Sequence, residues 1–400
     1  MSAERTALVL GSTGVAGSAA VNELSRQGWR VIAGARRPGE DTREQVTSVA
    51  LDLLDPGSVR QALAPFSITH VFYCVQYRDR APRAARSTDI KTIKRQLVLA
   101  SRMLPVLRWI PGAQGAFYHR IAAESGALDA QHRNLAMVKT VIDVLGQQPH
   151  NLEHLAVITG GKHYGMHLGP ALYPGHSAPY REDLTPRAPG PNWYYEVEDH
   201  LRALDTPWSW SIFRPSFIIG HARNAPYNFG TSLAVYASLR RALGEPLVFF
   251  GDQSAYDCQW DVSSARQIAE MMIWSSETAA AHGQAFNCTG DAHFRWRDLW
   301  PEIAQWFDLE PAFEPEGISV QRYLKDKGPI WDDLIKEHGL TPSPLRSLVS
   351  EGFLDKSMAI DWDAIYDMSK AKEAGFTQLP APLTTFTDLF HTLREDRVIP

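Results

Sequence analysis

Short, continuous apolar runs separated by amphipathic stretches dominate the first half of the chain. Residues 6–10 form the first run, and residues 29–33 form a second run after a stretch with helical spacing of Ala20, Val21 and Leu24. An apolar run of this length without polar alternation is typical of a strand buried on both faces of a parallel sheet. Strand, helix and strand therefore fit one βαβ unit.

The same alternation continues along the chain. Further strands are predicted at residues 49–53, 69–75, 155–158 and 209–213, with a helical pattern over 134–143. Strands that alternate with helices predict an α/β fold with a doubly wound parallel sheet of the Rossmann type. We expect residues 1–215 to form this domain. Residues 216–400, rich in Trp, Phe and Pro, should form mainly a smaller C-terminal substrate lobe, interleaved with the end of the Rossmann domain.

The segment from about 80 to 125 departs from this pattern. It is first basic and then apolar, has helical spacing from Ile93 to Met103, and is interrupted by Pro105 and Pro111, which disfavour a continuous helix. We expect an atypical helical insertion. A surface helix pair with solvated charges, a flap beside the site, a subunit contact and an association with a membrane surface remain alternatives.

A glycine-rich turn joins the first strand to the first helix, with the sequence GSTGVAG at 11–17. In such a turn one glycine permits the sharp bend, another lets backbone N–H groups approach a pyrophosphate, and a third lets helix and strand pack closely. The N-terminus of the helix then presents its partial positive charge to the phosphates. This pattern predicts a dinucleotide site formed by Gly11, Thr13, Gly14, Val15 and Gly17.

The residues after the second strand predict which dinucleotide binds. An acidic residue there would bind the ribose 2′-hydroxyl of NAD, but Arg36 and Arg37 occupy this place. Two guanidinium groups can bind a 2′-phosphate, so NADP(H) is the expected cofactor. Asp52, Leu53 and Cys74 should line the same site, because ligands bind beyond the carboxyl ends of such strands.

Composition argues against several other classes of protein. A net charge of −5 over 400 residues gives no electrostatic reason to expect a nucleic acid as partner. The cysteines, Cys74, Cys258 and Cys288, are odd in number and widely spaced, which favours neither a disulfide framework nor a metal site. The sequence has no signal-like leader and no apolar stretch of about 18 residues. We therefore expect a cytoplasmic protein without stable membrane insertion.

The usual catalytic pair of short-chain dehydrogenases is missing at its usual place. In those enzymes a Tyr-x-x-x-Lys pair on one helix supplies a proton donor and a lysine that lowers its pKa. The pattern occurs here at Tyr323/Lys327 and Tyr366/Lys370, far downstream of the nucleotide-binding strands. We interpret both as chance matches.

Five motifs in order resemble the progesterone 5β-reductase/iridoid synthase family of atypical extended short-chain dehydrogenases/reductases. They are TGGKHYG (159–165), PNWYYEVED (191–199), SWSIFRP (209–215), FFGDQSAYDCQWDVSSA (249–265) and PIWDDLIKEHGLTP (329–342). The resemblance covers nearly the whole chain outside 80–125. It implies that Tyr194 and Lys162 are the catalytic groups, and that Lys162, Arg214 and Pro215 lie beside the nicotinamide end of the cofactor.

The resemblance also implies a reaction. An NADPH-dependent oxidoreductase of this kind transfers a hydride to the β-carbon of an enone or enal in a small hydrophobic carbonyl compound. Tyr194 would hydrogen-bond to the enolate oxygen, where charge develops, and Lys162 would assist. The same groups can reduce a ketone or aldehyde, and a non-catalytic NADP(H)-binding regulator is a further alternative. A homodimer is also left open.

Two departures from the family bear on the substrate. Gln76 stands just beyond the fourth strand, where family members tend to carry a tryptophan. The family's Trp-Trp-Phe lid stretch is reduced to one candidate, Phe353. Together with Phe217, these residues are the substrate-pocket candidates. The two departures concern the choice of substrate rather than the choice of cofactor.

Overall fold

The computed structural model describes residues 5–39, 41–77, 127–147, 151–173, 175–223, 225, 227–350, 352–358 and 360–400. The predicted insertion at about 80–125 lies outside the described residues.

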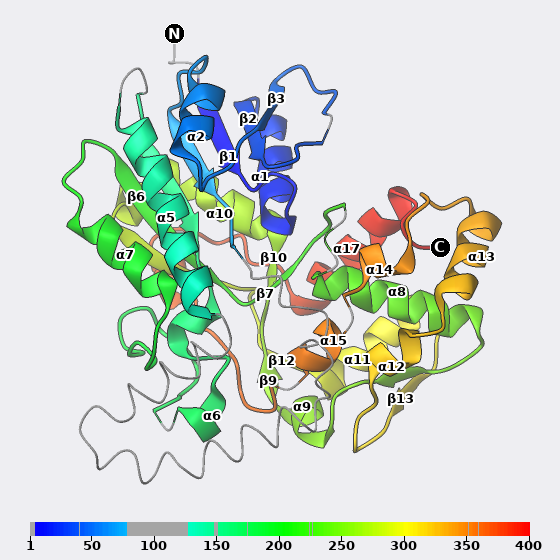
Figure 1. Cartoon of the computed structure of the whole chain (residues 1–400). Coiled ribbons are helices and arrows are strands. Elements are labelled where there is room, and N and C mark those ends of the chain that lie inside the picture. The colour runs from blue at the N-terminus through cyan, green and yellow to red at the C-terminus, as the bar shows by residue number, and fades with distance from the viewer. Residues whose placement is uncertain are drawn as a thin grey trace.

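One parallel sheet takes most of its strands from the first half of the chain and two from the second half (Figure 1). Its strands are β1 (Thr6–Leu10), β2 (Arg30–Ala35), β3 (Val46–Ala50), β4 (His70–Tyr73), β5 (His154–Ile158), β6 (Ser209–Pro215) and β11 (Gln284–Cys288). The order in the sheet is β11-β6-β5-β4-β1-β2-β3. The direction of winding reverses between β1 and β4, and such a switch point is where α/β sheets bind ligands. The predicted Rossmann fold is confirmed.

The third strand begins and ends earlier than the sequence pattern indicates. It spans Val46–Ala50 rather than 49–53, because its partner β2 ends at Ala35, which pairs with Ala50. Asp52 therefore lies in the following loop, where its carboxylate accepts a hydrogen bond from the Leu54 N–H at 3.0 Å. The loop still follows the carboxyl end of β3, as the site prediction requires.

Helices cover both faces of the sheet. One face packs against α1 (Val15–Arg26), α10 (Ala265–Glu277) and α16 (Ser369–Glu373), and the other against α2 (Pro56–Leu63), α5 (Ala127–Leu145) and α7 (Trp193–Ala203). Every residue of β1 is buried, which explains its unbroken apolar run. Among the described residues, no helix is both long and apolar enough to cross a membrane.

A second, aromatic-rich core lies in the C-terminal part of the chain (Figure 1). Its main helices are α8 (Phe229–Ala242), α11 (Trp296–Trp306), α13 (Gly328–His338) and α17 (Pro382–Glu395). Shorter helices are α6 (Gly169–Leu172), α9 (Gln253–Asp257), α12 (Val320–Leu324), α14 (Leu345–Leu348) and α15 (Phe353–Ser357). Three short strand pairs join them: β7 (Phe217–Ile219) with β10 (Val262–Ser264), β8 (Leu247–Phe249) with β13 (Pro311–Phe313), and β9 (Gln259–Trp260) with β12 (Phe294–Arg295). Because α10 and β11 return to the main sheet, residues after 216 contribute to both cores. The division of the chain at residue 215 stays a prediction.

Candidate functional site

A cavity of about 280 Å³ lies at the carboxyl ends of β1, β2 and β4. It collects residues that the sequence assigned to the cofactor or substrate, namely Gly11, Thr13, Gly14, Arg36, Asp52, Leu53, Cys74 and Gln76. These residues come from four separate loops. Tyr77 and Met137 also line the cavity, and the sequence analysis did not single them out.

The glycine turn at this cavity allows an unusually close approach of the chain to itself. Gly11 has φ +80°, and a Cβ atom on it would lie 2.8 Å from the carbonyl oxygen of Cys74. The helix α1 starts at Val15 after the N-cap residue Gly14, whose position carries no side-chain cap. The N–H groups of the first helical turn are therefore available to an anionic ligand. This arrangement fits the diphosphate of a dinucleotide.

The wall formed by residues 74–77 is held by a buried side chain. Asn134 on α5 accepts a hydrogen bond from the Tyr77 N–H at 2.7 Å and donates one to the Tyr77 carbonyl oxygen at 3.0 Å. This pairing satisfies both backbone groups of Tyr77, as a neighbouring strand would. The sequence showed Asn134 only as a polar residue in a helical pattern, so its role was missed.

The two predicted catalytic residues come from different elements. Lys162 is exposed in the 3-10 turn η2 (Gly161–Tyr164), which follows β5. Tyr194 lies in the first turn of α7 and is 5% exposed. A Cβ atom on Gly160 would lie 3.3 Å from the Tyr194 hydroxyl oxygen and 3.5 Å from the Pro215 carbonyl oxygen. The fold thus brings the Tyr194 hydroxyl to the carboxyl ends of β5 and β6.

Hydrogen bonds join the Lys162 turn to the start of α7. The N-cap residue Asn192 accepts a hydrogen bond from the Tyr194 N–H at 3.1 Å, and its amide donates one to the Lys162 carbonyl oxygen at 2.9 Å. The Tyr195 hydroxyl donates to the His163 carbonyl oxygen at 2.5 Å. Asparagine before a helical stretch is a recognisable N-cap signal, but nothing in the sequence indicated its second partner.

A buried ion pair lies beneath this turn. Arg214 donates to both carboxylate oxygens of Glu198, at 3.1 and 2.7 Å, and both residues are almost fully buried. Arg214 also donates to the Tyr164 hydroxyl at 3.0 Å, and His163 Nδ1 lies 3.1 Å from Glu198 Oε1. Desolvation alone would raise the pKa of Glu198, but His163 and Arg214 outweigh it and lower this pKa to about 2. The Arg214 guanidinium is therefore occupied inside the protein, which leaves the backbone at 214–215 as the part that can face a cofactor.

The remaining predicted residues are more scattered. Val15 and Gly17 form the start of α1, and Arg37 is exposed directly after β2. Phe217 stacks on Trp260, with ring centroids 5.1 Å apart. Phe353 begins α15 and meets Tyr227 edge-on, with ring centroids 5.9 Å apart. Of the substrate-pocket candidates, Gln76 lines the cavity at the ends of β1, β2 and β4, whereas Phe217 and Phe353 are not among the residues that line it.

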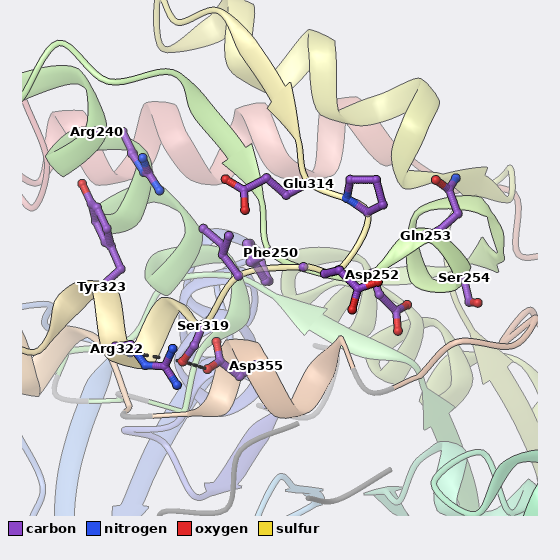
Figure 2. A pocket seen from close by; sticks show the side chains of 14 residues that line it. Arg240, Phe250, Asp252, Gln253, Ser254, Glu314, Ser319, Arg322, Tyr323 and Asp355 are labelled. Carbon is purple, nitrogen blue, oxygen red and sulfur yellow. Dashed lines mark hydrogen bonds between the residues drawn. The ribbon is translucent and has the colours of Figure 1, made fainter. Parts of the chain in front are cut away.

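The largest cavity described, of about 980 Å³, lies elsewhere (Figure 2). It belongs to the C-terminal core and mixes basic and acidic side chains, including Arg240, Arg322 and Glu314. At its rim Asp355 accepts a hydrogen bond from the Ser319 hydroxyl at 2.7 Å, drawn as a dashed line in Figure 2. None of the predicted site residues lines it, so it is separate from the candidate active site.

No group of three or more potential metal ligands occurs within the ranges that the structure describes.

Two curated proteins are similar to this chain over nearly its whole length. It is 27% identical to the (S)-8-oxocitronellyl enol synthase of Catharanthus roseus over 408 residues, which cover 98% of this chain and 92% of the relative. It is also 27% identical to the 3-oxo-Δ(4,5)-steroid 5-β-reductase of Arabidopsis thaliana over 414 residues, which cover 99% of this chain and 94% of the relative.

Solved structures show the same architecture. A UDP-glucose 4-epimerase from Thermotoga maritima superimposes with a TM-score of 0.57 at 14% identity, covering 98% of this chain and 99% of that one. A partial consensus L-threonine 3-dehydrogenase superimposes with a TM-score of 0.58 at 14% identity and the same coverage. At this level of identity the likeness shows the fold alone.

The family itself is shown by the sequence. Residues 67–400 match the PRISE-like Rossmann-fold domain, which confirms the resemblance drawn from the five motifs. The chain therefore belongs to the PRISE-like Rossmann-fold family and is an oxidoreductase of the extended short-chain dehydrogenase/reductase type.

Proposed function

We propose that this oxidoreductase uses NADPH to reduce the activated C=C bond of an enone or enal. The observation that carries the proposal is the meeting of the Tyr194 hydroxyl and the Lys162 turn at the carboxyl ends of β5 and β6 in a chain of this family. The name of the Arabidopsis relative, a 5-β-reductase of 3-oxo-Δ(4,5)-steroids, describes a substrate with both an oxo group and a double bond. A small hydrophobic carbonyl compound of this general class is the proposed substrate.

The cofactor proposal rests on the cavity of about 280 Å³ at the carboxyl ends of β1, β2 and β4, which we call the nucleotide cavity. Gly11, Thr13, Gly14, Val15 and Gly17 would hold the diphosphate, since the turn presents backbone N–H groups without an acidic side chain in the first helical turn. Asp52, Leu53 and Cys74 would border the adenosine and the nicotinamide ends from the loops after β3 and β4. Arg36 lines this cavity, and Arg37 is the next residue in the chain. A 2′-phosphate would therefore have two cationic partners.

The proposed chemistry assigns each residue one task. When bound, NADPH would supply a hydride to the β-carbon of the substrate and become NADP⁺, and a proton taken up from solvent at the α-carbon would complete the saturated product. Negative charge then moves to the carbonyl oxygen, and the Tyr194 hydroxyl donates a hydrogen bond to it. A donor that is already in place lowers the barrier most where charge develops during the reaction. Lys162 adds a positive charge that favours the enolate, and the backbone of Arg214 and Pro215 borders the nicotinamide.

Burial of Tyr194 supports this assignment. Its side chain is 5% exposed and packs with the apolar core beneath the sheet, so its hydroxyl approaches a substrate with little competing water. Electrostatic contacts are stronger in such a water-poor site than in bulk solvent. The neighbouring Tyr195 has a different environment, in which its hydroxyl donates to the His163 carbonyl oxygen.

The test is product identification with purified protein, NADPH and 2-cyclohexen-1-one, extended to an acyclic enal and a 3-oxo-Δ4 steroid. Tyr194→Phe should lower kcat/KM by about 10²–10³-fold, the effect of losing one oxyanion donor. Tyr236→Phe is the matched control, because Tyr236 is a buried tyrosine of the C-terminal core whose hydroxyl bonds the Val248 carbonyl oxygen. It should keep wild-type turnover.

The product separates the alternatives. A saturated ketone or aldehyde that depends on Tyr194 supports C=C reduction. An allylic alcohol as the sole product would move the protein to the carbonyl reductases. NADPH binding without turnover of any compound in the panel would favour a non-catalytic NADP(H)-binding regulator.

A further inference from the structure

The separation of the two catalytic candidates on different elements raises a structural problem. In a Tyr-x-x-x-Lys pair, one helix fixes the spacing of both side chains, since residues four apart share a helix face. Here Lys162 belongs to η2 and Tyr194 to α7. Their relative position therefore depends on contacts between the turn and the helix.

Side chains of α7 and its cap make these contacts. Asn192 bonds the Lys162 carbonyl oxygen at 2.9 Å, Tyr195 bonds the His163 carbonyl oxygen at 2.5 Å, and Glu198 lies 3.1 Å from His163 Nδ1. We call Asn192, Tyr195 and Glu198 the α7 clamp. The clamp holds the two consecutive residues Lys162 and His163 by hydrogen bonds to both of their backbone carbonyls, and Glu198 lies beside the His163 ring.

Tyr195 is the member whose chemistry is most restricted. Its hydroxyl donates to the His163 carbonyl oxygen and accepts a hydrogen bond from the Ala188 N–H at 2.8 Å. Its ring meets the His163 ring edge-on, with centroids 5.0 Å apart. Because its one proton is engaged by the turn that carries Lys162, Tyr195 is suited to positioning rather than to proton donation.

We propose that Tyr195 is a positioning residue, which with Asn192 and Glu198 holds the Lys162 turn against α7 so that Lys162 and Tyr194 act on one substrate carbonyl. The proposal rests on the proposed function, because it assigns both groups to the same reaction. It adds that the second tyrosine of the Tyr-Tyr pair replaces the spacing that a shared helix would supply. Small displacements of a catalytic group are enough to slow a reaction strongly.

Tyr195→Phe tests the clamp with the loss of a single oxygen atom. Tyr236→Phe is a close structural match, since the Tyr236 hydroxyl also donates to a backbone carbonyl, that of Val248 at 2.9 Å, and accepts from Arg240 Nε at 3.1 Å. Each variant loses one hydrogen bond to a backbone carbonyl and one accepted hydrogen bond, from the Ala188 N–H for Tyr195 and from the Arg240 guanidinium for Tyr236, but only Tyr195 contacts the Lys162 turn. The comparison separates positioning from a general loss of stability.

Asn192→Asp is a second variant, in case Tyr195→Phe does not fold. An aspartate keeps the oxygen that accepts the Tyr194 N–H and remains a favourable N-cap. It cannot donate to the Lys162 carbonyl oxygen, so it removes one clamp contact and leaves the helix start intact.

The readouts are hydrogen–deuterium exchange of residues 159–166, the affinity for NADPH, and kcat and KM for the enone. Tyr195→Phe and Asn192→Asp should speed exchange in 159–166 and lower kcat by about tenfold, with a smaller change in KM for the enone. Tyr236→Phe should change neither. Exchange at 159–166 that matches wild type, or kcat no lower than in Tyr236→Phe, would overturn the proposal.

A failure of the positioning role of Tyr195 can be distinguished from a failure of the proposed enone reduction. If the wild-type protein binds NADPH but reduces no enone, the reaction assignment fails. The clamp is then judged on exchange and on NADPH affinity. Faster exchange with weaker NADPH binding in Tyr195→Phe supports a positioned Lys162 turn, and wild-type values of either overturn it.

Discussion

Gly17 packs so tightly against Gly11 that a Cβ atom on Gly17 would lie 2.0 Å from the Gly11 carbonyl oxygen. Neither of these backbone segments can accept that atom without moving. The contact joins the start of α1 to the turn that borders the nucleotide cavity. The position of the turn that we propose to bind the phosphates therefore depends on glycine, which has no Cβ atom, at residue 17.

Gly17→Ala should therefore weaken NADPH binding by about tenfold or more, because displacement of the turn removes backbone donors worth roughly 1 kcal/mol or more each. Gly328→Ala is the control: a Cβ atom there meets nothing within 4 Å. That control should be neutral or slightly stabilising, by about 0.4–1 kcal/mol. Titration of intrinsic fluorescence with NADPH and thermal unfolding measure both effects. Wild-type affinity in Gly17→Ala would show that the turn does not bind the cofactor.

Arg36 and Arg37 should select NADPH over NADH. Replacing either by Ala removes a charge-assisted hydrogen bond to the 2′-phosphate, typically about 1.5–3 kcal/mol, or roughly 10–150-fold in affinity. NADH lacks this phosphate, so its affinity should stay within about twofold. Arg30→Ala is a matched control, since Arg30 is an exposed arginine at the opposite end of β2. An equal loss for NADPH and NADH would argue against 2′-phosphate recognition.

Lys162 should matter for turnover rather than for stability. Its side chain is exposed, and surface substitutions usually change stability by about 0.5 kcal/mol or less. Lys162→Met should lower kcat by about 10²-fold, in the range expected for a positioned charged group. Lys162→Arg retains the charge and should lose less. Steady-state kinetics with the enone measure the effect on kcat, and thermal unfolding measures the effect on stability. An unchanged kcat in Lys162→Met would show that Lys162 takes no part in the reaction.

Two buried histidines should make the fold sensitive to acid. His70 and His154 are paired neighbours on β4 and β5, and burial lowers their pKa values from 6.5 to about 4 and about 3. The folded state keeps them neutral, while the unfolded chain takes up protons below 6.5. Their contribution to stability is therefore lost as the pH falls from about 6.5 towards 4.

His154→Gln tests this pH dependence. Glutamine does not titrate, and it is polar enough to bond the hydroxyls of Ser209 and Ser275, which contact His154 Nδ1 and Nε2. Urea unfolding between pH 7 and 4 measures how the free energy of unfolding depends on pH. In the variant this dependence should be less steep than in wild type, because about one proton fewer is taken up on unfolding. Glu198 acts in a different pH range. Because its pKa is lowered, its contribution to the free energy of unfolding is lost only as the pH falls from about 4.5 to about 2. An unchanged slope above pH 4.5 would show that His154 is not responsible.

Local sequence patterns predicted every strand of the main sheet except β11, and most of the residues that line the nucleotide cavity. The strand at 6–10 and the helix after the glycine turn follow from apolar periodicity and from the conformational needs of the turn. Arg36 and Asp52 follow the carboxyl ends of neighbouring strands, so the strand order predicts that they meet. The end of β3 was misjudged because it depends on where β2 stops, and a single strand does not record the length of its partner.

The sequence by itself therefore determined the α/β fold, the glycine turn between β1 and α1 and, through its motifs, the family. Only the tertiary structure decided that Tyr195 bonds the His163 backbone, that Glu198 pairs with Arg214, and that Asn134 holds Tyr77. Local periodicity records which face of an element is buried, and backbone conformation records where a turn forms. Contacts between residues far apart in the chain depend on how whole elements pack, because each side chain offers the same donors and acceptors to many partners and the fold selects one.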